Sequence, residues 1–410
     1  MIQFTNAPTV VHAPMKITAF RSSQVLASLI RRAIISTAAA LLLVSFSARG
    51  YAQSYVFTND DSFTNGVSFY TIGSGGGLTF SYEVPGPGLG IGGGFFGMIR
   101  LATLDSGNTQ CIFASEAYTG DVFWIVPGSA AAAGSAPGSQ SDVGSANGIA
   151  LAANTQYLYA GFSSSSTIAT FQVQSGCALT FVGDTAVAGL NGGFVDGMAL
   201  HGNMLIASYA DGSIQSFNIA NGMPVSNGDE QDSTASVGGE TYPNAIDITE
   251  DGHFAIFGDT STADVVEVSD ISSGKLTPTV VYQTHAGINS SNILLSPDES
   301  VLYISNTQGA VVTAVFFNKS TGQITRGCTS PPLKNYVQGW QYLGSLALQE
   351  ITGNGGGVYV AEFGTPSGIA TVNLTVHGSA CTLEEADASP TPDEYSQGLL
   401  SIGRFPPRSF

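Results

Sequence analysis

The segment SPDESVLYISN, residues Ser296 to Asn306, decides the fold. It is a polar turn followed by a run rich in valine, tyrosine and isoleucine, and the apolar run SSNILL comes directly before it. Turn residues between two short runs of β-forming residues predict an antiparallel hairpin. The same order of features returns in PNAIDITEDGHFAIFGD from Pro243 and in ANGIALAANTQYLYAGF from Ala146. The chain therefore contains an internal repeat.

Weaker copies of the hairpin extend the repeat to six complete units. Two further β-forming runs follow the hairpin in these units, such as TIATFQVQ and CALTFVGD in the unit that begins near Ala146. A repeat of about 50 residues made only of strands is typical of one four-stranded blade of a β-propeller. The last apolar residues of the predicted first strands are Leu101, Leu151, Leu200, Ile248, Leu295 and Leu348.

The two ends of the repeat complement each other. YVFTN, at Tyr55 to Asn59, matches a second strand, and a third and a fourth strand follow it without any first strand. Near the other end, Leu399 to Ile402 in GLLSIG reads as a first strand with nothing after it. Pairing these two strands would leave no free sheet edge. We therefore predict an all-β, seven-bladed propeller with four antiparallel strands per blade, closed by its N- and C-terminal strands, with Leu400 beside Val56.

Residues 1–52 are predicted to be a secretory signal peptide. Arg31 and Arg32 precede an apolar run from Ala33 to Val44, and the small residues of SARGYAQS offer cleavage after Ala52. Met15 is an alternative start. The apolar run is too short for a membrane span, so we expect a secreted or periplasmic protein with no membrane insertion after removal of the signal.

Residues 53–410 are expected to form a single propeller domain. Glycine, serine and alanine dominate the stretch 128–145. Such a composition is typical of a flexible connection, and we predict a loop there between the second and third blades.

The chain is acidic. It carries 12 lysine and arginine residues against 30 acidic ones, for a net charge of −18. An acidic surface repels phosphate backbones and anionic lipids, which disfavours nucleic-acid and membrane-surface partners. The mature chain would be more acidic still, because the predicted signal removes Lys16, Arg21, Arg31, Arg32 and Arg49.

Four cysteines, Cys111, Cys177, Cys328 and Cys381, are present. In an exported chain they permit two disulfides in three possible pairings. Their spacing does not match a zinc site, so we expect structural bridging, with all three pairings open.

The repeat resembles that of the YVTN-type and lactonase-like seven-bladed propellers. The resemblance extends from Tyr55 to about Gly403 and is most specific in SPDESVLYISN and TEDGHFAIFGD. It implies either a secreted propeller without catalysis or an enzyme that hydrolyses or forms sugar-derived or aromatic lactones. Aspartate and glycine in these turns serve backbone geometry, so they identify a fold and not a reaction.

Loops before first strands and after second strands should meet at one rim of the central channel. Acidic residues follow most of the second strands, and we take Glu116 and Glu362 as candidate catalytic carboxylates. Oxygen ligands of this kind suit Ca²⁺ or Mg²⁺. The alternative is that these are ordinary turn residues and no cofactor is required. The candidate cation ligands are Asn147, Asp196, Asn244, Asp211 and Asp259.

Two further residues have chemistry suited to the rim. His285 lies in a loop before a first strand, where an imidazole could act as a general base, although an exposed loop histidine is the plainer interpretation. Arg100 lies in a predicted inner strand, where a guanidinium could hold a carboxylate or stabilise an oxyanion, or else pair with a neighbouring acid.

Two functions of different classes follow. The first is an exported scaffold that binds a small molecule, a polysaccharide or a cell-surface protein. The second is a hydrolase of a non-phosphorylated, sugar-type lactone at the central channel, with or without a cation. We favour the first, because a propeller offers a rigid concave rim whether or not chemistry occurs there.

Overall fold

A computed structural model of the chain describes residues 54–410 with gaps. The described parts form one compact unit, Ser54–Phe410. No helix within them is long and apolar enough to cross a membrane. The predicted signal peptide lies outside the described residues, together with 61–64, 91–100, 106–109, 140–143, 145–148, 188, 234–242, 244, 259–264, 285–289, 307–308, 335–341, 350–355, 364–366, 379, 394–400 and 406–410.

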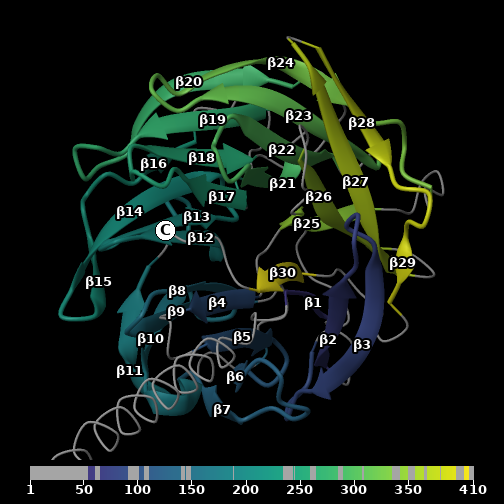
Figure 1. The fold of residues 1–410 in the computed structure, drawn as a ribbon. Helices are drawn as coiled ribbons and strands as arrows, with labels where there is room; N and C mark the ends of the chain where they lie inside the picture. The colour runs from purple at the N-terminus through teal and green to yellow at the C-terminus, as the bar shows by residue number, and fades with distance from the viewer. Residues whose placement is uncertain are drawn as a thin grey trace, which may run out of the picture. The chain divides into compact units, whose positions relative to one another are not determined.

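Seven antiparallel sheets follow one another around a centre in this unit (Figure 1). The first blade combines β30 (Ser401–Phe405), β1 (Tyr55–Asn59), β2 (Gly66–Ile72) and β3 (Leu78–Pro85). The second contains β4 (Leu101–Asp105), β5 (Gln110–Glu116), β6 (Asp121–Ile125) and β7 (Gly134–Pro137). The third contains β8 (Ile149–Ala153), β9 (Tyr157–Phe162), β10 (Thr167–Val173) and β11 (Leu179–Ala186).

The remaining four blades repeat this order. The fourth contains β12 (Val195–His201), β13 (Met204–Tyr209), β14 (Ser213–Ala220) and β15 (Met223–Ser226), with β16 (Gln231–Asp232) also paired to β14. The fifth contains β17 (Ala245–Ile248), β18 (Phe254–Gly258), β19 (Val265–Asp270) and β20 (Thr277–Gln283). The sixth contains β21 (Ser290–Leu295), β22 (Val301–Asn306), β23 (Val311–Asn318) and β24 (Gln323–Thr329). The seventh contains β25 (Tyr342–Gln349), β26 (Gly357–Phe363), β27 (Gly368–His377) and β28 (Ala380–Glu385), with β29 (Thr391–Pro392) also paired to β27.

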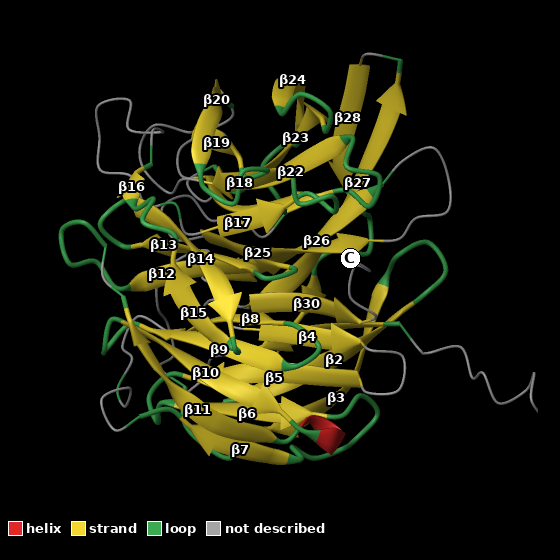
Figure 2. Ribbon diagram, turned by 90° about the vertical axis from the view of Figure 1, so that its left-hand side faces the viewer, coloured by secondary structure: helices red, strands yellow, loops and turns green. Residues whose placement is uncertain are grey.

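The prediction of an all-β, seven-bladed propeller is confirmed. Each first strand contacts the first strand of the next blade, and contacts of β30 with β25 and β4 complete the ring. Apart from strands and turns, the described residues contain one short 3-10 helix, η2 (Ser175–Cys177), which is drawn red in Figure 2.

The core lies between the blades. Successive side chains of a strand point to opposite faces, so a second strand buries one set of residues against each neighbouring blade. In β1, Val56 packs with Tyr359 of the seventh blade, whereas Phe57 packs with Ile112 of the second. Both faces are therefore buried, which explains the continuous apolar runs of these strands.

The ring is closed by β1 and β30, as the sequence indicated, but with a different register. β30 begins at Ser401 and ends at Phe405, so Val56 pairs with Arg404 and Thr58 with Ile402. Gly403 lies opposite Phe57, and a Cβ on this glycine would lie 2.6 Å from the ring. Packing of Gly403 on Phe57 thus positions β30 against β1. Leu399 and Leu400, which were predicted to belong to this strand, lie outside the described residues.

Part of the predicted flexible loop 128–145 is a strand. β7 forms the fourth strand of the second blade, with Gly134 paired to Trp124. A Cβ at Gly134 would lie 2.4 Å from the Trp124 ring. The small residues of this stretch therefore let it lie against a large aromatic side chain.

Two disulfides connect neighbouring blades. Cys111 in β5 bonds Cys177 in η2, which joins the second blade to the third. Cys328 in β24 bonds Cys381 in β28, which joins the sixth blade to the seventh. The structure thus selects one of the three pairings that the sequence left open.

Candidate functional site

One position recurs at the rim where the second strands end. It is occupied by Glu116 at the end of β5, by Glu362 in β26 and by Asp60 directly after β1. Glu116 and Glu362 make the last pair between the second and third strands of their blades, and Asp60 follows the last such pair of the first blade. Their exposed fractions are 0% for Asp60 and Glu116 and 3% for Glu362. The rim therefore carries buried acids in three described blades.

Glu116 is enclosed by the connection that follows the first blade. The backbone N–H of Gly88 donates to Oε1 of Glu116 at 2.6 Å, and Oε2 has no hydrogen-bond partner among the described residues. Burial raises the pKa of Glu116 to about 7; the Gly88 hydrogen bond opposes this rise and the charge of Asp121 adds to it. Such a carboxyl group could exchange a proton near neutral pH.

Glycines allow this enclosure. A Cβ at Gly86 or Gly88 would lie 2.3 Å from a carboxyl oxygen of Glu116. The backbone of the connection therefore lies directly against the carboxyl group, and a side chain at either glycine would clash with it.

Asp60 belongs to a second buried group at the seam between the seventh and first blades. Its carboxylate oxygens lie 2.7 Å from the Thr58 hydroxyl and 2.9 Å from the Ser68 hydroxyl. Thr58 also lies 3.0 Å from a carboxyl oxygen of Asp393, which follows β29 and is 2% exposed. Burial and then the charge of Asp393 raise the pKa of Asp60 well above its ordinary value, while the two hydroxyls oppose that rise.

Asp211 organises a loop. Its two oxygens accept hydrogen bonds from the backbone N–H groups of Asn191, Gly193 and Ser213 and from the Ser213 hydroxyl, at 2.6 to 3.0 Å. Burial raises the pKa of Asp211, but these hydrogen bonds outweigh it and the pKa lies below its ordinary value. The carboxylate of Asp211 is therefore held within its own loop by these hydrogen bonds.

Asp196 lies at a β-bulge in β12. The pairing with β13 shifts between Val195 and Gly197, and the side chain of Asp196 is fully buried. A bulge re-aims a side chain and is frequent near functional sites. Asp196 therefore remains a candidate ligand, at the start of a first strand and so at the rim where the second strands end.

Polar groups at the rim also join the first two blades. The side-chain amides of Asn59 and Asn65 both donate to the backbone carbonyl of Ser115, at 3.1 and 2.8 Å. Side chains at the rim therefore help to hold these two blades together.

Several predicted site residues lie outside the described residues. In the described part of the chain, no group of three or more histidine, cysteine, aspartate or glutamate side chains is arranged to hold a metal ion. The convergence of the predicted cation ligands therefore stays a prediction. The residues outside the description are Arg100, Asn147, Asn244, Asp259 and His285.

Sequence reasoning missed the role of Asp393. It follows β29 in a proline-containing stretch, and nothing local marks it as a partner of Asp60. Only closure of the ring brings the two acids to the same hydroxyl. The predicted pairing of the chain ends was therefore the one sequence feature that could have indicated their proximity.

Comparisons with known proteins agree with this architecture. A family model described as "Lactonase, 7-bladed beta-propeller" matches residues 129–393. A search of curated proteins finds no match.

Solved structures share the fold at low sequence identity. A functionally unknown protein from Desulfotomaculum acetoxidans is 12% identical with a TM-score of 0.60, over 85% of this chain and 98% of that one. A candidate 6-phosphogluconolactonase from Bacteroides uniformis is 14% identical with a TM-score of 0.53, over 68% and 81% of the two chains. A periplasmic gluconolactonase from Pseudomonas aeruginosa is 13% identical with a TM-score of 0.50, over 67% and 81%. By its family match, the chain belongs to the lactonase family of seven-bladed β-propellers.

Proposed function

We propose that this protein is an exported propeller that binds a partner outside the cytoplasm, such as a polysaccharide or another cell-surface component. One observation carries the proposal. Asp60, Glu116 and Asp211 all accept hydrogen bonds from neighbouring backbone or hydroxyl groups. Hydrogen bonds of this kind fix the loops at the rim, so the rim offers a preformed surface to a partner.

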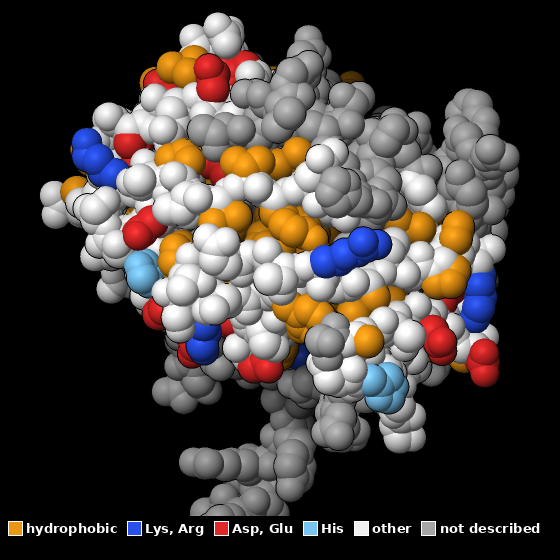
Figure 3. Space-filling model, turned by 90° about the horizontal axis from the view of Figure 1, so that it is seen from above, with side chains coloured by type: hydrophobic (Ala, Val, Ile, Leu, Met, Phe, Trp, Pro, Cys, Tyr) orange, Lys and Arg blue, Asp and Glu red, His pale blue; other side chains and the backbone are white. Residues whose placement is uncertain are grey.

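Two features support a binding role. Disulfides form and persist in oxidising compartments, and here they fasten two pairs of blades, which gives a rigid surface at low entropic cost of binding. On the face drawn in Figure 3, acidic and basic side chains are scattered between uncharged ones. An uncharged partner fits such a face better than a polyanion does.

Co-sedimentation tests this proposal. Purified protein is mixed with insoluble cellulose, chitin, xylan or peptidoglycan and centrifuged, with an inert protein of similar acidity as the control. We expect this protein, but not the control, to enter the pellet with at least one polymer. Failure with every polymer, together with hydrolysis of a lactone that Glu116→Gln abolishes, would overturn the binding role in favour of catalysis.

A second candidate function is hydrolysis of a non-phosphorylated lactone. The observation that favours it is the near-neutral pKa of Glu116, at the rim position that Glu362 also occupies. A rim carboxylate would accept a proton from water, and the water oxygen would attack the lactone carbonyl carbon. The ring C–O bond would then break as the leaving oxygen takes up a proton, which yields the open hydroxy acid.

The remaining predicted residues have defined roles in this second candidate. Arg100 would stabilise the oxyanion, His285 would act as an additional base, and a Ca²⁺ or Mg²⁺ ion would polarise the carbonyl. A phosphorylated lactone is disfavoured, because the chain has few cationic groups to hold phosphate.

A lactone panel with and without chelator tests the hydrolase. Gluconolactone should turn over faster than its 6-phosphate ester. Glu116→Gln and Glu362→Gln should each lower kcat, by about 100-fold for loss of a general base. Turnover that both variants leave unchanged would show that these carboxylates are not catalytic.

A further inference from the structure

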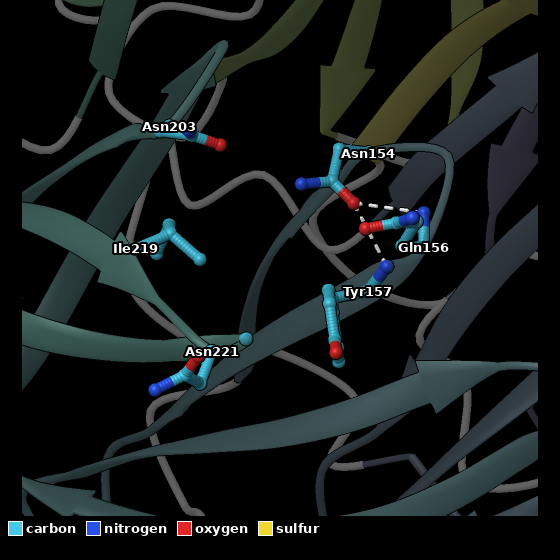
Figure 4. Close-up of a pocket in the computed structure, with 7 residues that line it drawn as sticks. Asn154, Gln156, Tyr157, Asn203, Ile219 and Asn221 are labelled. Carbon is cyan, nitrogen blue, oxygen red and sulfur yellow. Dashed lines mark hydrogen bonds between the residues drawn. The ribbon is translucent and has the colours of Figure 1, made fainter.

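A polar cavity of about 450 Å³ lies between the third and fourth blades (Figure 4). It is formed by the turn between β8 and β9 in one blade and by the turns after β12 and β14 in the next. These turns lie at the rim opposite to the ends of the second strands. The lining side chains are Asn154, Gln156, Tyr157, Asn203, Ile219 and Asn221.

The side chains that line this cavity are all uncharged, and most of them are carboxamides. Four of the side chains are carboxamides, one is a phenol ring and one is aliphatic, and none is charged. A carboxamide offers both a donor and an acceptor, which matches a sugar hydroxyl that also donates and accepts. The volume is within the usual range of about 300–1,000 Å³ for small-molecule sites. The cavity therefore suits a neutral polyhydroxylated ligand of one or two rings.

One side of the cavity is held in place by the turn of the third blade. Oδ1 of Asn154 accepts hydrogen bonds from the backbone N–H groups of Gln156, at 2.9 Å, and Tyr157, at 2.8 Å. These bonds orient the carboxamide, and its amino group points toward the side on which Asn203 lies (Figure 4). The donor is thus in position before any ligand arrives, which reduces the entropic cost of binding.

The other side is held by contacts between the two blades. Tyr159 donates its hydroxyl to the backbone carbonyl of Gly222 at 3.1 Å. Gly222 has a φ of +86°, and a Cβ there would lie 2.4 Å from the ring of Tyr157. The backbone N–H of Ile219 donates to the carbonyl of Asn203 at 2.7 Å, which joins the two turns of the fourth blade. The cavity is consequently part of the packed fold.

We propose that this cavity binds a neutral saccharide, as a free oligosaccharide or as a short segment of a polysaccharide. The carboxamides hydrogen-bond its hydroxyl groups, and the half-buried ring of Tyr157 contacts its apolar C–H face. The inference deepens the proposed binding function, on which it rests for its ligand class, and it does not involve the acidic rim.

Titration of purified protein with neutral trisaccharides tests the inference. The probes are maltotriose, cellotriose, mannotriose and triacetylchitotriose, with trigalacturonate as the charged comparison, and binding is measured by calorimetry and by saturation transfer to the ligand. We expect at least one neutral probe to bind and trigalacturonate to bind more weakly, because the lining offers no cation.

The variant Gln156→Ala/Asn203→Ala/Asn221→Gly removes three carboxamides, and we expect it to fold like the wild type. All three side chains are exposed, and glycine at 221 keeps the left-handed backbone, where Asn221 has a φ of +52°. We expect binding to weaken by about tenfold or more, the effect of losing roughly 1.4 kcal/mol. The matched control is Gln323→Ala, which removes an exposed carboxamide from the sixth blade and should bind like the wild type.

Two results would overturn the inference: no neutral trisaccharide binds, or the triple variant binds as tightly as the wild type while its melting curve is unchanged. Co-sedimentation separates this failure from failure of the proposed function. If the triple variant still enters the pellet with a polymer, the partner is bound elsewhere and only the cavity assignment is wrong.

Discussion

Asp60 and Asp393 share one hydroxyl group, that of Thr58, at the seam between the seventh and first blades. A hydroxyl has a single proton to donate, so it can serve only one carboxylate as a donor. While Thr58 donates to one of the two carboxyl groups, the other receives no hydrogen bond from this hydroxyl. The geometry therefore agrees with the raised pKa of Asp60, whose first cause is burial.

The raised pKa of Asp60 predicts a pH-dependent stability at the seam. Because the pKa of Asp60 is higher in the folded chain, its contribution is complete below the ordinary value of 3.8 and is lost as the pH rises through the raised value. Asp60→Asn removes the ionisation. We expect the free energy of unfolding of the variant to improve relative to wild type as pH increases from 5 to 8, as measured by denaturant titration.

Asp298→Asn provides a control of opposite sign. Burial raises the pKa of Asp298, but hydrogen bonds from Ser296 and Ser300 outweigh it and lower the pKa below its ordinary value. Its contribution is present above that value and is lost only in acid. The loss in free energy of unfolding caused by Asp298→Asn should therefore be constant between pH 5 and 8. A constant difference in unfolding free energy for Asp60→Asn as well would contradict a raised pKa of Asp60 in the folded protein.

Glu116→Gln should stabilise the protein at alkaline pH. The pKa of Glu116 is raised from 4.5 to about 7 by burial, so its stabilising contribution is lost between these values as the pH rises. Between pH 4.5 and 7, we expect the free energy of unfolding of the variant to rise by about 2 kcal/mol relative to that of the wild type. Above pH 7 this difference should level off. Thermal melting over this range measures the effect, with Glu384→Gln as a control for removing one exposed charge. A gain that continues to rise above pH 8 would assign the titration to another group.

Loss of a disulfide should destabilise the ring. The Cys328–Cys381 bond closes a loop with a sequence separation of 53 and connects the sixth and seventh blades. We expect the double substitution to serine to cost about 2–5 kcal/mol and to make the two blades more susceptible to proteolysis. Melting with and without reductant measures this. An identical response of wild type and variant to reductant would show that the bond does not form in solution.

Ile402→Ala tests the closure of the ring. Ile402 is 5% exposed and packs with Val56 and Tyr359, across the strand that the C-terminal region contributes to the first blade. Truncating a buried isoleucine costs about 2–5 kcal/mol. We expect that loss in denaturant unfolding, whereas Val225→Ala, at a side chain that is 52% exposed, should change little. If Ile402→Ala and Val225→Ala changed the free energy of unfolding equally, the seam would not be packed as described.

The amino-acid sequence by itself determined the repeat, the number of blades and the closure by both chain ends. The repeat is a local feature, because strand periodicity and turn residues recur in every unit and specify the same hairpin each time. The closure was predictable because the first and last units are each incomplete. The same reasoning placed Glu116 and Glu362 in the loops after their second strands, whereas the structure has them at the end of β5 and within β26.

Contacts between blades were decided by tertiary structure alone. The disulfide pairing, the meeting of Asp60 with Asp393, the enclosure of Glu116 by Gly88 and the carboxamide cavity all join segments from different blades. Side-chain packing across an interface depends on how two sheets fit together, which no local pattern encodes. The sequence therefore specified the ring, and the fit of one blade against the next determined which of its polar residues are buried and which line a cavity.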